Sequence, residues 1–110
     1  MPNCRLLLLG LPLLALVLPP LVAYAAEVHR ISQKSRAFSA KEVAIAVGDT
    51  VQFGNDDEFI HQVFVESKTF NFDTAESSPG DKIDIKFTVA GTFEVHCHIH
   101  PKMGLAVTVK

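Results

Sequence analysis

The most reactive side chains lie close together near the end of the chain, in the segment His96-Cys97-His98-Ile99-His100-Pro101-Lys102-Met103. Within eight positions this segment supplies one thiol, three imidazoles and one thioether, and a further imidazole, His61, stands 36 positions before Cys97. Thiolate, imidazole and thioether groups in combination are the ligands of soft or borderline metal ions. The spacing therefore predicts a metal site.

Copper suits this set of ligands better than zinc does. Two histidines and one cysteine in a trigonal arrangement, with a methionine at a longer axial distance, form the ligand set of blue-copper sites. Structural zinc sites use four firm nitrogen, sulfur or oxygen ligands and gain little from a thioether. The sequence thus predicts one copper ion, cycling between Cu(I) and Cu(II), with the metal ligands His61, Cys97, His100 and Met103.

Each of these residues also has an ordinary structural interpretation. Cys97 alone is typical of a small buried hydrophobic residue, Met103 of a core filler and His61 of a hydrogen-bonded interior histidine. The combination at this spacing is what favours the metal. Three further histidines are interpreted as solvated surface imidazoles, namely His29, His96 and His98. The two that flank Cys97 leave a weak second metal site open.

The elements around the segment are expected to bring the ligands together. Cys97 ends an alternating strand on its inward face, and the chain then turns, so that His100 points back to the same metal. Pro101 stiffens this turn, and Met103 closes it. His61 comes from the end of a neighbouring strand, which gives the site one anchor on a separate element.

Alternation of apolar and polar residues dominates the chain after residue 26. This pattern is typical of half-buried strands, and turn signals such as Gly48-Asp49 and Pro79-Gly80 separate the runs. The expected strands cover residues 28–31, 43–47, 50–53, 61–65, 83–89, 93–97 and 105–109. No stretch of this region has a convincing helical period. The predicted fold class is therefore all-β, an antiparallel β-sandwich of two sheets or a small barrel.

The first quarter of the chain has the composition of an export signal. A short basic segment, Met1 to Arg5, precedes an apolar run from Leu6 to Val22 and the sequence Ala23-Tyr24-Ala25, which signal peptidase accepts. An uncleaved membrane anchor is the alternative, because the run approaches the roughly 18 to 20 residues that span a bilayer. Its three prolines weigh against a regular spanning helix. We expect residues 1–25 to be a cleaved signal peptide, residues 26–110 to form one domain, and the protein to be periplasmic with no membrane span after cleavage.

The composition of residues 26–110 restricts what this domain does. Eighty-five residues allow one compact core and leave little room for a substrate pocket, so we do not expect an enzyme. Residues 26–110 contain nine basic and twelve acidic residues, because Arg5 lies in the expected signal peptide. This slightly acidic balance argues against a nucleic-acid partner, which would require a basic surface. Cys97 is then the only cysteine, so no disulfide forms within the domain, and a bound metal accounts for a lone thiol in an oxidising compartment. We expect a monomer.

At these positions the sequence resembles the cupredoxins, the family of small blue-copper proteins. The similarity rests on His61 and on four segments: Val47-Gly48-Asp49-Thr50-Val51-Gln52-Phe53 followed by Asn55, Pro79-Gly80, Ala90-Gly91-Thr92-Phe93, and Cys97-x-x-His100-x-x-Met103-Gly104. The two residues between His100 and Met103 resemble the short ligand loop of amicyanin more than the longer loops of plastocyanin and pseudoazurin. The resemblance implies a Greek-key sandwich and a type 1 copper centre. It also implies that the His100 ring edge lies at the surface within an apolar patch and passes electrons.

Two positions depart from the pattern of amicyanin and plastocyanin. Those proteins usually carry Asn directly after the first His ligand and Ser or Thr directly after the Cys, and a hydrogen bond between the two joins the loops. Here the positions hold Gln62 and His98. We hypothesise that the longer amide and the larger ring contact each other across the same gap. Because such contacts tune a metal site, the reduction potential is expected to depart from that of the family.

The sequence predicts a one-electron carrier that acts between redox protein partners in the periplasm. The resemblance implies a donor dehydrogenase and an acceptor cytochrome or oxidase, and the short loop suggests methylamine dehydrogenase as the donor. The alternative is a copper-handling protein that stores or delivers the ion, which the extra imidazoles of His96 and His98 support. Reversible redox cycling without loss of metal favours the carrier, whereas ready transfer of copper to a chelator or partner favours handling.

Overall fold

The computed structural model describes residues 2, 3, 5, 7–20 and 25–110. Residues 7–20 form neither helix nor strand, and their large apolar side chains are at least 75% exposed, so this segment adds nothing to the core. Within the described ranges no helix has the length and apolar character that crossing a membrane requires. Most of the expected cleavage sequence, Ala23-Tyr24-Ala25, lies outside the described residues, and the division at residue 25 stays a prediction.

The described residues form nine strands joined by turns and loops. In chain order they are β1 Val28–Lys34, β2 Ala37–Phe38, β3 Glu42–Ile45, β4 Thr50–Asn55, β5 Val63–Val65, β6 Phe72–Asp73, β7 Lys82–Lys86, β8 Gly91–Cys97 and β9 Gly104–Val109. Burial alternates along β4 and β9, as it must when successive side chains point to opposite faces of a sheet. One face of these strands therefore lies in the core and the other faces outward.

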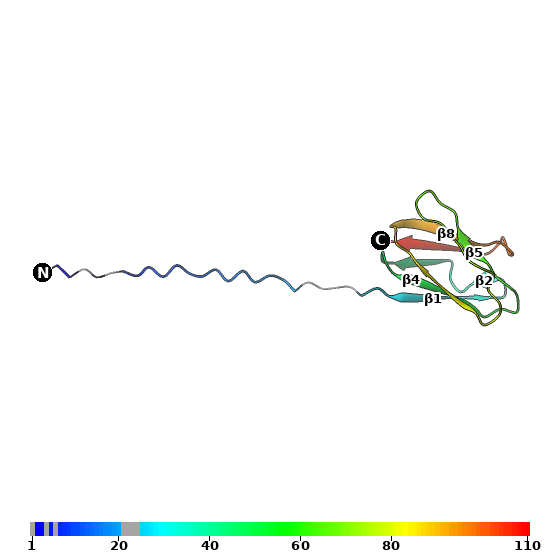
Figure 1. The fold of residues 1–110 in the computed structure, drawn as a ribbon, viewed down its shortest axis with the longest axis horizontal. Helices are drawn as coiled ribbons and strands as arrows, with labels where there is room; N and C mark the ends of the chain where they lie inside the picture. Colours follow the sequence, from blue (N-terminus) through cyan, green and yellow to red (C-terminus); the bar gives the residue numbers. More distant parts are fainter. Residues whose placement is uncertain (1, 4, 6, 21–24) are drawn as a thin grey trace.

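The strands form two sheets that pack as a sandwich (Figure 1). One sheet has the order β2-β1-β4-β7, and the other has the order β3-β9-β8-β5-β6. Consecutive strands change sheet at five of the eight connections, and only β1–β2, β5–β6 and β8–β9 stay within one sheet. The predicted all-β sandwich is confirmed, and the repeated crossing between sheets fits the Greek-key connections that the resemblance implied.

Large aromatic side chains fill the centre of the sandwich. The Phe87 ring is fully buried, and its centroid lies 5.1 Å from that of Phe70, 5.9 Å from that of Phe72 and 6.3 Å from that of Phe93. Burying a side chain of this size stabilises a fold by about 1.5–3 kcal/mol. The core therefore provides a rigid body that holds the loops at both ends.

Three details differ from the sequence-based expectation. β1 pairs with β4, and β3 with β9, in parallel, so both sheets are mixed; alternation reports the buried face of a strand but not the direction of its neighbour. The two-residue strands β2 and β6 are too short to produce an alternating signal. The strand expected over residues 43–47 is shorter, because β3 ends at Ile45 and Val47 belongs to the following turn, where it is 48% exposed.

Loops from both sheets meet where β8 ends at Cys97 and β9 begins at Gly104, and we call this the ligand end of the sandwich. Figure 1 shows the intervening loop, in orange, at the end away from the C-terminus. Asn55, the last residue of β4, is fully buried there, and its side-chain amide donates to the Phe59 carbonyl (2.9 Å) and the Ser77 carbonyl (2.8 Å). These bonds join the loop after β4 to the segment that lies beside the metal site.

Candidate metal centre

Three of the predicted ligands come together at the ligand end. Cys97 is the last residue of β8 and lies opposite Val63 of β5 in antiparallel register. His61 stands two residues before Val63, forms a single β-bridge with Ser77 and therefore points to the same face as Val63. His100 follows in the loop between β8 and β9. Strand pairing thus positions two ligands, and the loop returns the third to them.

The donor atoms of these three side chains form a compact triangle. His61 Nδ1 lies 3.6 Å from Cys97 Sγ and 3.2 Å from His100 Nδ1, and Cys97 Sγ lies 3.8 Å from His100 Nδ1. A point equidistant from the three atoms is therefore roughly 2.1 Å from each, close to the length of metal–imidazole and metal–thiolate bonds, about 2.0–2.3 Å. The triangle has the size and the donor chemistry that a single metal ion requires.

Most of this triangle is sheltered from solvent. His61 is 0% and Cys97 is 2% exposed, whereas His100 is half-buried. Met103, the fourth predicted ligand, is 2% exposed, and its backbone N–H donates to the His100 carbonyl over 3.0 Å. This bond closes the turn that Pro101 begins, with the thioether buried at the base of the loop.

Asp57 fixes the orientation of His61 from the side away from the triangle. His61 Nε2 lies 3.0 Å from Asp57 Oδ2. With the proton on Nε2 donated to the carboxylate, Nδ1 keeps the free lone pair that faces Cys97 and His100, and the imidazole becomes a stronger ligand. Sequence reasoning missed Asp57, because an acidic residue four positions before a histidine in a loop has no signal of its own.

The Asp57 carboxylate is buried, and backbone N–H groups keep it ionised. The Arg36 N–H donates to Oδ2 and the Glu58 N–H donates to Oδ1, each over 2.8 Å. The hydrogen bond from Arg36 contributes most to lowering the pKa of Asp57 to about 2, and the bonds from His61 and Glu58 lower it further. Burial acts in the opposite direction but does not offset them. A negative charge therefore lies directly behind the metal site at neutral pH.

His100 forms the accessible edge of the site. Its ring centroid lies 4.8 Å from that of His61 and 5.9 Å from that of Phe59, whose side chain is 39% exposed. Burial, followed by the charges of His61 and Arg36, lowers the pKa of His100 below its ordinary value. The ring is therefore neutral near pH 7, as a metal ligand must be.

Gln62 and His98, the two departures from the family pattern, are joined through a third residue. The Gln62 side-chain nitrogen lies 3.2 Å from Asp73 Oδ1, and His98 Nε2 lies 3.1 Å from Asp73 Oδ2. No hydrogen bond links the Gln62 and His98 side chains directly in the described part of the chain. The two side chains are therefore bridged by hydrogen bonds to Asp73, which comes from β6, a strand that the alternation did not reveal. The hypothesis of a direct contact between amide and ring stays a prediction.

The backbone completes this connection between the two ligand-bearing segments. The His98 N–H donates to the Gln62 carbonyl over 2.9 Å, and the Gln62 N–H points at Cys97 Sγ over 3.4 Å. A donor aimed at a thiolate ligand stabilises negative charge on the sulfur and so tunes the metal.

The histidines that flank Cys97 have partners of their own. The His98 ring stacks on Phe64 with centroids 3.8 Å apart and an interplanar angle of 10°, and His96 Nδ1 lies 3.3 Å from the Met103 carbonyl. Among the residues that the structure describes, neither belongs to a group of three metal donors. The weak second metal site left open at these positions therefore gains no support from the geometry.

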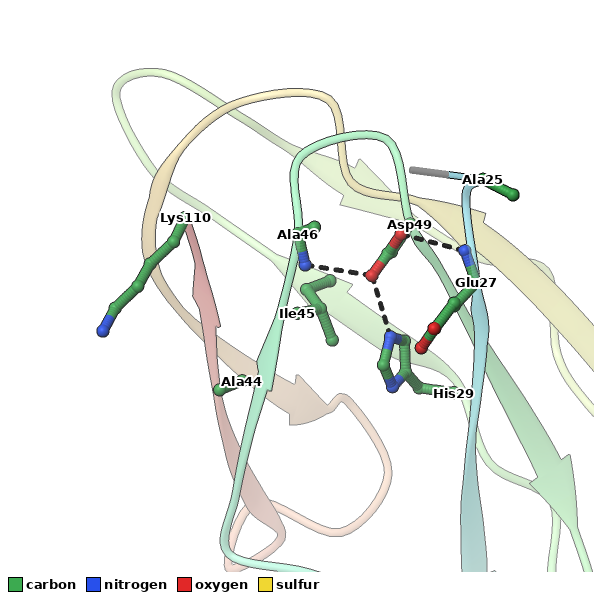
Figure 2. Close-up of a pocket in the computed structure, with 8 residues that line it drawn as sticks. All are labelled: Ala25, Glu27, His29, Ala44, Ile45, Ala46, Asp49 and Lys110. Carbon is green, nitrogen blue, oxygen red and sulfur yellow. Dashed lines mark hydrogen bonds and ion pairs between the residues drawn. The ribbon is translucent and has the colours of Figure 1, made fainter. Parts of the chain in front are cut away.

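A second group of potential metal donors consists of Glu27, His29 and Asp49. These side chains line a surface cavity of about 400 Å³ at the opposite end of the sandwich. Figure 2 shows that both Asp49 oxygens are already engaged. The Glu27 N–H donates to Oδ1, while the Ala46 N–H and His29 Nε2 approach Oδ2, each over 2.9 Å. These hydrogen bonds lower the pKa of Asp49 to about 2, with the bond from Glu27 contributing most, followed by those from His29 and Ala46. The cluster is therefore explained without a metal, because its hydrogen bonds connect the start of β1 to the turn before β4.

Fold and site together define a β-sandwich metalloprotein whose Cys-His₂ centre is buried except at the edge of His100. A family model described as copper binding proteins of the plastocyanin/azurin family matches residues 25–110, and the chain belongs to this family. The resemblance to the cupredoxins is thereby confirmed, and the metal is one copper ion.

Individual relatives are distant. Plastocyanin from Ulva pertusa is 24% identical over 84 residues, which cover 68% of this chain and 86% of that protein. Chloroplastic plastocyanin from Physcomitrium patens is 27% identical over 77 residues, covering 62% of this chain but only 46% of that protein. The chain therefore spans less than half of the moss relative.

Solved structures share the fold. Amicyanin from Paracoccus versutus has a TM-score of 0.70 and 23% identity, with 76% of this chain and 81% of that chain covered. A copper-containing nitrite reductase from Thermus scotoductus SA-01 has a TM-score of 0.69 and 28% identity, with 74% of this chain but 22% of that chain covered. The second likeness is thus to one part of a larger protein.

Proposed function

We propose that this protein is a one-electron carrier whose type 1 copper centre is formed by His61, Cys97, His100 and Met103. The observation behind the proposal is the largely buried donor triangle, in which two imidazole nitrogens and a thiol sulfur lie within 3.2–3.8 Å of one another. Copper bound there supplies a Cu(I)/Cu(II) couple that gains or loses one electron. The membership of a copper-binding family supports the choice of metal.

The chain's own residues hold this site rigid. Asp57 fixes the His61 ring, and Asn55 fixes the loop that carries Asp57 by accepting its backbone N–H over 3.0 Å. On the other side, the Asp73 bridge and the backbone bond between His98 and Gln62 hold the residues that follow Cys97 and His61. A ligand set that is held in this way rearranges little between oxidation states, which favours rapid electron transfer.

The arrangement favours a carrier over the alternative of a copper-handling protein. Storage or delivery benefits from accessible donors that pass the ion along, yet His96 and His98 are engaged with Met103, Phe64 and Asp73. An enzyme is disfavoured as well, because copper catalysis needs an open coordination position and four protein ligands leave none.

We further propose that electrons enter and leave through the edge of His100. Two exposed apolar residues lie near this ring, Phe59 at 39% and Ile99 at 43% exposure, and Ile99 lines a shallow groove with His100 and Pro101. An apolar surface around the exposed edge of the His100 ring suits brief contact with redox protein partners. A donor dehydrogenase and an acceptor cytochrome or oxidase fit this role, with export to the periplasm through residues 1–25.

Visible absorption and electron paramagnetic resonance of the Cu(II)-loaded protein test the ligand assignment. An intense thiolate-to-copper band and a narrow copper hyperfine splitting are expected, and both should disappear in Cys97→Ala. Cys97→Ser is a closer match in size and should lose the same band. A colourless protein, or a copper signal that survives the loss of Cys97, contradicts the assignment.

Repeated oxidation and reduction in the presence of a copper chelator then separate carrier from handler. The carrier keeps its copper through many cycles, because three of the four ligands are buried. Quantitative loss of copper to the chelator on the timescale of a cycle would instead support handling.

A further inference from the structure

We propose that two cationic residues beside His100, Arg36 and Lys102, make the ligand end a docking surface for a redox partner with an acidic face. The inference rests on the proposed electron-carrier function and adds the chemistry of the partner. Arg36 and Lys102 line one groove of about 300 Å³ together with Ile99, His100 and Pro101. Two positive charges, an apolar surface and the edge of the exit ring therefore share a single depression.

The backbone holds Arg36 at this place. Ser35 and Arg36 form the two-residue turn between β1 and β2, and both have positive φ angles, 53° and 55°. Such turns ordinarily use Asn and Gly, because other residues are strained in the left-handed region. The strained turn brings the Arg36 N–H to 2.8 Å from Asp57 Oδ2, the same carboxylate that orients His61.

The side chain of Arg36 is held as well. Its guanidinium carbon lies 4.2 Å from the centre of the Phe59 ring, which in turn lies 5.9 Å from the His100 ring. A cation stacked on an aromatic face keeps its charge exposed while it loses freedom of movement. The three side chains form a continuous row from the cation to the ring through which electrons are proposed to pass.

The charge of this groove is opposite to that of the molecule. The chain has a formal net charge of −2, but no carboxylate is found among the described residues that line the groove. Asp56 and Glu58 are exposed in the loop after β4, yet neither lines it. A second copy of the chain would bring like charges together at the ligand end. An acidic partner instead gains attraction there, which raises the rate of encounter.

Two small oxidants of opposite charge test this proposal without the partner. The reduced, copper-loaded protein is mixed with hexacyanoferrate(III), an anion, or with tris(phenanthroline)cobalt(III), a cation, and each oxidant accepts one electron from the protein. The ratio of the two rate constants largely cancels any change in the reduction potential of the protein. We expect Arg36→Gln and Lys102→Gln each to lower the anion-to-cation ratio by about threefold or more at low ionic strength.

Two further variants make the result specific. Arg36→Lys keeps the charge and should keep the ratio. Lys86→Gln removes the same charge from β7, where Lys86 pairs with Thr50 at the opposite end, and should also leave the ratio unchanged. An unchanged ratio in both groove variants, or an equal change in Lys86→Gln, overturns the proposal and leaves the carrier function intact. Failure of both oxidants to react would refute the carrier function itself.

A redox-inert anion gives a readout that is independent of electron transfer. In the reduced, Cu(I)-loaded protein, hexacyanochromate(III) broadens the amide resonances close to its binding site. We expect broadening at Arg36, Phe59, Ile99, His100 and Lys102. The broadening should be lost when Arg36 and Lys102 are both replaced by Gln. Broadening centred on the lysines of β7, Lys82 and Lys86, would contradict the assignment of the surface.

Discussion

The carboxylate of Asp57 accepts two backbone N–H groups and lies 3.0 Å from His61 Nε2. Removing its negative charge destabilises Cu(II) more than Cu(I), because the oxidised ion has the larger charge. We therefore expect Asp57→Asn to raise the reduction potential by roughly 50 mV or more, measured by protein voltammetry. Asp56→Asn, next to it but exposed, is the control and should shift the potential little. Equal shifts in the two variants would argue against an effect transmitted through His61.

Single residues differ in how far the sequence reveals their roles. Cys97, His100 and Met103 stand within seven positions, so their spacing alone indicates a common metal, and His61 follows from its inward phase on a strand. Asp57 and Asp73 act on the site only because the chain crosses between elements to bring them there. A loop carboxylate has no period and no motif, and its partner becomes visible only when the sheets are assembled.

Among the elements, the loop after β4 depends on one buried amide. Asn55 donates to the carbonyls of Phe59 and Ser77 and accepts the Asp57 N–H. Asn55→Ala leaves these three buried or partly buried backbone groups without their partner, so we expect the free energy of unfolding to fall by about 2–4 kcal/mol in denaturant titrations. Gln52→Ala, which removes an amide bonded to exposed Asp84, should cost less than about 1 kcal/mol. Similar losses in both variants would contradict a special role for Asn55.

The strands themselves were predicted more fully than their pairing. β4, β8 and β9 follow the expected alternation because each presents one apolar face to the core. The parallel pairing of β1 with β4 could not be predicted, since burial of one face is the same for either direction of the neighbouring strand. The strained turn between β1 and β2 has no Gly or Asn to mark it, and it was missed for that reason.

At the scale of the whole molecule, one buried carboxylate organises each end of the sandwich. Asp57 joins the β1–β2 turn to the metal ligand His61, and Asp49 joins the start of β1 to the turn between β3 and β4. Length and composition predicted a single domain without a disulfide, but they did not indicate how so short a chain fixes its loops. Hydrogen bonds from backbone N–H groups to these two carboxylates supply part of that restraint.

The carboxylate at the end away from the metal makes a prediction about acid stability. The pKa of Asp49 is lowered from 3.8 to about 2 in the folded protein, so the unfolded state binds more protons between these values. The stabilising contribution of Asp49 is therefore fully present above about pH 4 and is lost as the pH falls through about 2. Asp49→Asn lacks the charge that these hydrogen bonds stabilise, so it should be less stable than the unaltered protein at pH 7. Because Asn does not titrate while Asp49 loses its charge in acid, the difference in stability should shrink toward about pH 2.5. Denaturant unfolding of both proteins, compared in the same metal state at each pH, measures this. Thr92→Val is the control, because the hydroxyl that it removes lies 3.4 Å from the hydroxyl of Thr108, which does not titrate, and its difference should stay constant. A difference between Asp49→Asn and the unaltered protein that is the same at both pH values would mean that the hydrogen bonds to Asp49 do not depend on its charge.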